Sequence, residues 1–237
     1  MPGAGAGRRA VSGEEVRPSF YALRTGGWRD YITILHLPYT AWNLAYVAVG
    51  ASLAPVFRTN RMVWTMAAFA LALGVSAHAL DELNGRPLQT EIPGRMLVVL
   101  AVISLGGACA IGVWAASAWG WGLLAFVAVG AFVVPAYNLE WFGGLFHNAW
   151  GLALAWAAFP VLTAFYAQAQ TLRAEAILAA GFASLLIVVQ RTLSTPVRRA
   201  RRALGSLEGV EPMERSLRIL PWAVILLAAA LLTARLT

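Results

Sequence analysis

Residues 63–93 read VWTMAAFALALGVSAHALDELNGRPLQTEIP, an apolar run that ends in a group of polar residues. The apolar part, residues 63–80, is long enough to cross a bilayer, which requires about 20 residues in a helix. Asp81 and Glu82 therefore stand where the predicted helix leaves the membrane. An ionisable cluster at such a place indicates a functional site. The alternative is an ordinary solvated loop in which these acids pair with Arg86.

The whole chain has the composition of a membrane protein. Of its 237 residues, 59% are hydrophobic and 12% are charged, and the mean hydropathy is +0.67. These values exclude a soluble domain. The net charge of +7 comes from arginines that lie between apolar runs. We therefore attribute the basic charge to membrane topology and not to nucleic-acid binding.

Seven apolar stretches predict an all-α, polytopic transmembrane bundle of about seven helices. They span residues 31–57, 63–80, 96–116, 119–137, 148–167, 176–193 and 219–232. Residues 1–30 carry five arginines and begin with a Gly/Ala-rich segment. This composition predicts a disordered, basic cytoplasmic tail, followed by a transmembrane helical domain at residues 31–237.

The distribution of the arginines predicts the orientation of the bundle. With seven spans, 14 of the 18 arginines lie on the side of the N-terminus and four on the other. Cytoplasmic loops carry the excess of basic residues, so we expect a cytoplasmic N-terminus and an outer C-terminus. This orientation places the segment around Asp81 and the segments 137–148 and 190–208 together on the cytoplasmic side. We expect the membrane to be a prokaryotic cell membrane.

The second polar segment, YNLEWFGGLFHN at residues 137–148, contributes several candidate side chains. Tyr137, Asn138 and His147 can bind a substrate. Glu140 is the most informative of them, because this loop contains no arginine or lysine to pair with it. For His147 the alternative is a structural histidine held by hydrogen bonds.

The third polar segment, QRTLSTPVRRARRALGSLE at residues 190–208, contains a predicted helix start. Ser194 or Thr195 can cap a helix that has Pro196 at its first position. The arginines after this point occupy one helix face and apolar residues another. The pattern predicts a basic amphipathic helix that lies on the inner leaflet.

The arginines of this segment have two possible roles. They can anchor the helix to anionic lipid headgroups. Alternatively, Arg191 and Arg198 face a cavity and bind phosphate, while Arg201 and Arg202 face the lipid.

The first polar segment resembles a motif of the UbiA-type intramembrane prenyltransferase superfamily. That motif is typically Asn-x-x-x-Asp-x-x-x-Asp, followed by Arg-Pro and Ile-Pro. In this sequence the three motif positions hold Ala77, Asp81 and Gly85, and Arg86-Pro87 and Ile92-Pro93 follow. Asp81 alone matches, and the adjacent Glu82 can substitute for a lost acid.

Two further regions bear on this resemblance. Residues 150–168 resemble the fifth helix of quinone-biosynthesis members of the superfamily. After the sixth predicted helix, Gln190-Arg191 stands where the family has its second acidic motif. The chain also has seven predicted helices where the family usually has nine.

The resemblance implies a helical bundle that binds Mg²⁺ and an isoprenyl diphosphate at the cytoplasmic face. It implies transfer of the isoprenyl chain to an acceptor, with Asp81 and Glu82 as Mg²⁺ ligands and, together with Glu140, as catalytic residues. The alternative is a non-catalytic relative that binds an isoprenoid lipid or a partner membrane protein, which the missing second motif favours. The candidate substrate-binding residues are His78, Asn84, Arg86, Tyr137, Asn138, His147, Gln190, Arg191 and Arg198.

Overall fold

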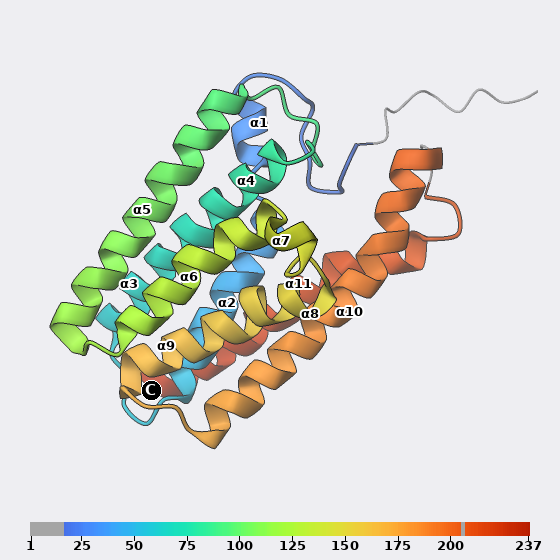
Figure 1. Ribbon diagram of the computed structural model, residues 1–237. Helices are drawn as coiled ribbons and strands as arrows, with labels where there is room; N and C mark the ends of the chain where they lie inside the picture. The colour runs from blue at the N-terminus through green and yellow to red at the C-terminus, as the bar shows by residue number, and fades with distance from the viewer. Residues whose placement is uncertain (1–16, 205–206) are drawn as a thin grey trace, which may run out of the picture.

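The computed structural model describes residues 17–204 and 207–237, and within these ranges the chain forms helices and no strand. The described part is therefore an all-α bundle (Figure 1). In chain order its elements are α1 (Trp28–Thr33), α2 (Leu37–Leu53), α3 (Thr59–Phe69), the π-helix η1 (Ala70–Ala77), α4 (His78–Leu83), α5 (Gly94–Trp119), α6 (Leu123–Asn138), α7 (Trp141–Gly144), α8 (Ala149–Ala153), the π-helix η2 (Leu154–Ala158), α9 (Phe159–Ala169), α10 (Ala174–Leu204) and α11 (Glu211–Leu236).

Five helices are long and apolar enough to cross a membrane, which indicates an integral membrane protein. The other two predicted spans are shorter helices, since α2 has 17 residues and α6 has 16. The number of seven membrane crossings therefore stays a prediction. The five candidate spans are Thr59–Leu83, Gly94–Trp119, Ala149–Ala169, Ala174–Ala203 and Glu211–Leu236.

Helix α2 lies in the middle of the bundle, with α5 and α10 at opposite edges (Figure 1). It packs against α9 and α11. At Gly50 the backbone of α9 comes so close that an added methyl group would overlap the carbonyl oxygen of Val161. Small residues allow such close approach, which drives the association of helices in membranes.

Four arginines lie at the end of the bundle where α9 ends and α10 begins. They are Arg58, Arg61, Arg173 and Arg235, and the C-terminus lies at this end too (Figure 1). Arg61 donates to the carbonyl oxygen of Ala167 at 2.8 Å. The three polar segments lie at the opposite end, near α4, α7 and the end of α10 (Figure 1). Among the described residues the arginines are thus divided between the two ends as the sequence predicts, and the orientation relative to the cytoplasm stays a prediction.

Residues 17–30 pack against the polar end of the bundle. Ala22 and Asp30 are each 2% exposed. The carboxylate of Asp30 accepts hydrogen bonds from the backbone N–H of Gly26 at 2.9 Å and of Glu91 at 2.7 Å. This buried carboxylate ties the segment to the loop after α4, so the predicted tail boundary at residue 30 is corrected. Residues 1–16 lie outside the described residues.

Helix α10 continues through the predicted helix start, which is therefore wrong. The hydroxyl groups of Ser194 and Thr195 donate to the carbonyl oxygen of Arg191, at 3.3 and 2.8 Å, inside one continuous helix. Pro196 lies in the helix interior, where it removes one backbone hydrogen bond. The arginine-rich segment consequently extends a candidate span, and does not form a separate surface helix.

Candidate functional site

A cavity of about 570 Å³ lies among the three polar segments. Its walls come from the segment before α1, from α2, α4, the connection after α6, η2, α10 and α11. Leu152, Trp156 and Ile187 give it an apolar part. Ten of the twelve predicted site residues line the cavity, namely His78, Asp81, Asn84, Tyr137, Asn138, Glu140, His147, Gln190, Arg191 and Arg198.

The π-helix η1 sets the direction of the side chains that follow it. A π-helical turn contains an extra residue and changes the faces on which later side chains lie. The hydroxyl group of Ser76 donates to the carbonyl oxygen of Ala101 in α5 at 3.0 Å and fixes this turn. His78 and Asp81 then line the cavity, one helical turn apart. No described residue makes a hydrogen bond or ion pair with the Asp81 carboxylate, which leaves its oxygens for a ligand.

Glu82 and Arg86 are the two predicted site residues that do not line the cavity. The Glu82 side chain is 1% exposed. Its carboxylate accepts hydrogen bonds from the N–H of Leu88 at 2.9 Å, the N–H of Thr90 at 2.8 Å and the hydroxyl of Thr90 at 2.9 Å. Arg86 donates to the carbonyl oxygens of Thr90 and Ile92 at 2.9 and 2.7 Å.

These contacts correct the predicted roles of both residues. Glu82 and Arg86 hold the loop after α4 in its conformation, and Arg86 itself has a positive φ of 52°. The loop needs these groups because buried backbone N–H groups must be hydrogen-bonded. Glu82 therefore anchors the loop after α4. It does not line the cavity with Asp81, as a second metal ligand would.

The second polar segment forms a compact corner of the cavity. The ring of His147 stacks on Tyr137 with 4.6 Å between centroids, and its Nδ1 lies 3.1 Å from the carbonyl oxygen of Tyr137. Nδ1 is also 3.9 Å from the carboxylate of Glu140. Asn84 donates to the carbonyl oxygen of Asn138 at 3.0 Å, so this corner is tied to the first polar segment.

Helix α10 contributes the cationic wall. Arg191 donates to the hydroxyl oxygen of Tyr137 at 3.3 Å. Arg198 lies seven residues and Arg202 eleven residues further on, so the three share one helix face. Within the described residues none of these three forms an ion pair with an acid.

Arg201, predicted to face the lipid, instead forms a buried ion pair. It lies 2.6 Å from a carboxylate oxygen of Glu214 in α11, and the two side chains are 8% and 4% exposed. Arg218 binds the other oxygen of Glu214 at 2.6 Å. Arg201 and Arg202 both line the cavity, which corrects the predicted lipid-facing placement. The ion pair joins the end of α10 to the start of α11.

A further part of the cavity wall was not predicted from the sequence. Residues 18–21 cover one side of the cavity, and Tyr21 hydrogen-bonds to Nδ1 of His36 at 2.8 Å. Burial, followed by the neighbouring His78 and Arg198, lowers the pKa of His36 well below its usual value. Asn43 also lines the cavity. The signal for a helix start, Pro38 after His36, was present in the sequence but lay inside a long apolar stretch.

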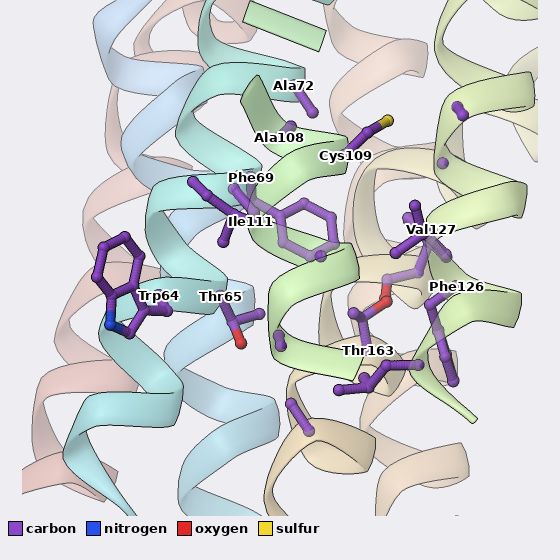
Figure 2. Close-up of a pocket in the computed structure, with 18 of the residues that line it drawn as sticks. Trp64, Thr65, Phe69, Ala72, Ala108, Cys109, Ile111, Phe126, Val127 and Thr163 are labelled. Atoms are coloured by element: carbon purple, nitrogen blue, oxygen red, sulfur yellow. The ribbon is translucent and has the colours of Figure 1, made fainter. Parts of the chain in front are cut away.

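A second, apolar pocket of about 90 Å³ lies between α3, η1, α5, α6 and α9. Figure 2 shows its labelled side chains, which include Phe126 and Val127 from α6 and Cys109 and Ile111 from α5. No residue lines both this pocket and the polar cavity. The pocket contains no acid or arginine, so it lacks the groups that chemistry on a phosphate needs.

The oxygen donors that line the cavity decide whether it can hold Mg²⁺. Asp81 and Glu140 are the carboxylates that line it. Within the described residues no group of three or more His, Cys, Asp or Glu is placed to hold a metal ion. Mg²⁺ usually takes one or two protein carboxylates and completes its shell with water and substrate phosphates. The donors therefore fit Mg²⁺ bound chiefly through a phosphate ligand.

Comparisons with protein-family models, with characterised proteins and with solved structures find no match for this chain. The resemblance to the UbiA-type superfamily rests on the sequence around Asp81 and on residues 150–168. Membership of that superfamily consequently stays a prediction.

Proposed function

We propose that the chain is a membrane transferase that moves an isoprenyl chain from its diphosphate to an acceptor at the cytoplasmic face. The observation that supports this proposal is the convergence of Asp81, Glu140 and Arg191 on one cavity. These residues come from three distant segments. Side chains that are scattered in sequence and gathered around one cavity are the usual basis of a binding or catalytic site.

The charges of the cavity suit a diphosphate. Arg191, Arg198 and Arg202 lie on one wall, and the arginine guanidinium binds phosphate through two parallel hydrogen bonds. The apolar part around Trp156 and Ile187 suits the isoprenyl chain. In this arrangement the allylic carbon lies between the arginines and the apolar part.

The carboxylates have a separate role in the proposed reaction. Asp81 would hold Mg²⁺, with Glu140 as the other carboxylate on the same cavity. When bound, Mg²⁺ neutralises the charge that develops on the leaving diphosphate. Arg191 stabilises the same charge from the α10 wall, since a fixed cation near a leaving group lowers the barrier to its departure.

The proposal is tested by ligand-dependent thermal unfolding of the purified protein in detergent. We expect geranylgeranyl diphosphate to raise the melting temperature when Mg²⁺ is present, because a ligand at a hundredfold excess over its Kd stabilises by about 2.7 kcal/mol. Arg191→Ala or Arg198→Ala should weaken binding by about 1.5–3 kcal/mol, the range for hydrogen bonds to charged groups. Arg95→Ala is the control, because Arg95 is exposed at the start of α5 and does not line the cavity.

Two results separate the alternatives. Stabilisation that persists in a chelator would indicate phosphate binding by arginines without Mg²⁺. Equal small effects at Arg95, Arg191 and Arg198, together with weaker binding to anionic vesicles, would indicate headgroup anchoring and contradict the transferase proposal.

The second candidate function is a non-catalytic protein that binds an isoprenoid lipid or a partner membrane protein. The hydrogen bonds of Glu82 favour it, because they leave Asp81 as the one acid of the first motif on the cavity. Release of pyrophosphate from geranylgeranyl diphosphate distinguishes the two functions. Tight binding without release, in the presence of candidate acceptors, supports the binding protein.

A further inference from the structure

The connection between α6 and α8 exposes large apolar side chains. Phe142 is 71% exposed and Leu145 is 64% exposed, and Trp141 before them is exposed as well. We call residues 140–147 the α7 corner, after the short helix within it. A patch of large apolar side chains on the outside of a protein marks a surface that lipid or another protein covers.

The lengths of α5 and α6 give the depth of the α7 corner. The two helices pack against each other and are joined by a turn at residues 120–122, and α5 has 26 residues where α6 has 16. At about 1.5 Å per residue, α6 ends roughly 24 Å from that turn, whereas α5 reaches roughly 39 Å. Figure 1 shows the same offset, because α7 lies well short of the level at which α5 begins.

The turn between α5 and α6 lies at one boundary of the membrane. The guanidinium group of Arg61 lies over the ring of Trp119, 5.4 Å from its centroid. Tryptophan is enriched where a membrane helix meets the headgroups, and arginine is costly inside the hydrocarbon core. That core is about 30 Å thick. Measured from the turn, the α7 corner therefore begins inside the hydrocarbon core, near the opposite boundary.

The outer side of the α7 corner continues the outer surface of the neighbouring helices. Phe132, which is exposed on α6, has its ring 5.6 to 6.5 Å from three rings of the corner, those of Trp141, Phe142 and Phe146. Trp150, at the start of the next candidate span, is exposed as well. An apolar surface that passes from one helix through the corner to the next is suited to lipid.

The size of the patch also favours lipid over a partner protein. A stable interface between proteins takes about 800 Å² from each partner, which is roughly 20–30 residues a side. The α7 corner itself supplies three large exposed apolar side chains. Such a patch is small for a protein interface, whereas contact with acyl chains has no minimum area.

The backbone of the α7 corner is compatible with this depth. The N–H of Gly144 donates to the carbonyl oxygen of Glu140, and the N–H of His147 donates to that of Gly144, each at 2.9 Å. On the inner side, Glu140 and His147 line the polar cavity. Irregular backbone at membrane depth is tolerated where it is buried in protein or lines a water-filled cavity.

We propose that the α7 corner is embedded in the bilayer, with Trp141, Phe142 and Leu145 in contact with the acyl chains of the leaflet at the polar end. The corner then separates lipid on its outer side from Glu140 and His147 on its inner side. This membrane contact is independent of the proposed transferase function, because it uses only the outer surface of the bundle.

Spin labels measure the depth of the corner in vesicles of phosphatidylcholine and phosphatidylglycerol. The chain has one cysteine, so Cys109→Ala gives a background in which Phe142→Cys or Leu145→Cys can be labelled. Collisions with oxygen, which concentrates in hydrocarbon, are compared with collisions with a nickel complex, which stays in water. At both positions we expect the ratio of oxygen to nickel collisions to be at least fivefold higher than at Thr25→Cys, which is exposed before α1. Val102→Cys, exposed on α5, is the lipid-facing control.

The two labelled positions give independent readings, so a substitution that prevents folding at one leaves the other to decide. A ratio equal to that at Thr25→Cys would place the corner in water and overturn the proposal. Labels that neither oxygen nor nickel reaches would indicate a covering protein, such as a second copy of the chain, and would overturn it as well. A ratio between the values at Thr25→Cys and Val102→Cys, at least fivefold above the former, supports a corner embedded near the boundary of the hydrocarbon core.

Discussion

Replacement of Glu82 by glutamine should destabilise the protein without removing the ligand site. The carboxylate of Glu82 is 1% exposed and accepts three hydrogen bonds of 2.8 to 2.9 Å. Glutamine has one acceptor oxygen, so it can keep both bonds from Thr90 but turns its amide group toward the N–H of Leu88. Loss of one hydrogen bond to a charged group costs about 1.5–3 kcal/mol. For a chain of this length that cost corresponds to a fall in melting temperature of about 3–12 °C.

The measurement is thermal unfolding in detergent, together with hydrogen exchange at the amides of Leu88 and Thr90. Exchange at both amides should become faster in Glu82→Gln. Asp81→Asn is the matched control, since it makes the same chemical change one residue earlier at a side chain with no described hydrogen bond. It should leave the melting temperature of the unliganded protein nearly unchanged and weaken the Mg²⁺-dependent effect of geranylgeranyl diphosphate. A Glu82→Gln variant that keeps its stability and loses that Mg²⁺-dependent effect would contradict the role of Glu82 as the anchor of the loop after α4.

Three further predictions concern other parts of the molecule. Glu214→Ala should lower the free energy of unfolding by about 3–5 kcal/mol, because it leaves the buried cation of Arg201 without its partner. Chemical denaturation measures this loss. The double variant Glu214→Ala with Arg201→Met should recover much of it. The pKa of His36 is lowered in the folded protein, so the unfolded state takes up the proton first and stability should fall as the pH drops below about 6.5. The melting temperature of His36→Phe should therefore depend less on pH between about pH 7 and 5 than that of the wild type. An equal dependence in both proteins would contradict the attribution of this effect to His36. Reporter fusions should place the two chain ends on opposite sides of the membrane, and both ends on one side would remove the count of seven crossings.

Several features of the fold could be predicted from the sequence because they follow from the cost of placing charge in a bilayer. Apolar runs of the required length predict helices, and five of them are long and apolar enough to be candidate spans. Polar residues are expelled to the ends of such runs. Asp81, Tyr137 and Arg191 each stand at one of these ends. They could therefore be predicted as candidate site residues from the sequence alone.

Side-chain direction could not be predicted in the same way, because successive residues in a helix point about 100° apart. Asp81 and Glu82 are neighbours of the same chemical type, yet one lines the cavity and the other is bound to Leu88 and Thr90. The π-helix η1 adds a further rotation before them, and a sequence pattern does not locate it.

The sequence by itself determined the all-α class, the candidate spans and the segments that carry the polar residues. The tertiary structure decided which of these residues face one another. Asn43 and His36 are recognised as cavity residues only from the packing of α2, because a single amide or imidazole near an apolar stretch does not indicate a site in the sequence. Arg201 is held at the cavity wall by its ion pair with Glu214, which is 13 residues away in the sequence. The physical reason is that hydrophobic patterning is a property of each helix alone, whereas a hydrogen bond or an ion pair depends on the position of a second helix.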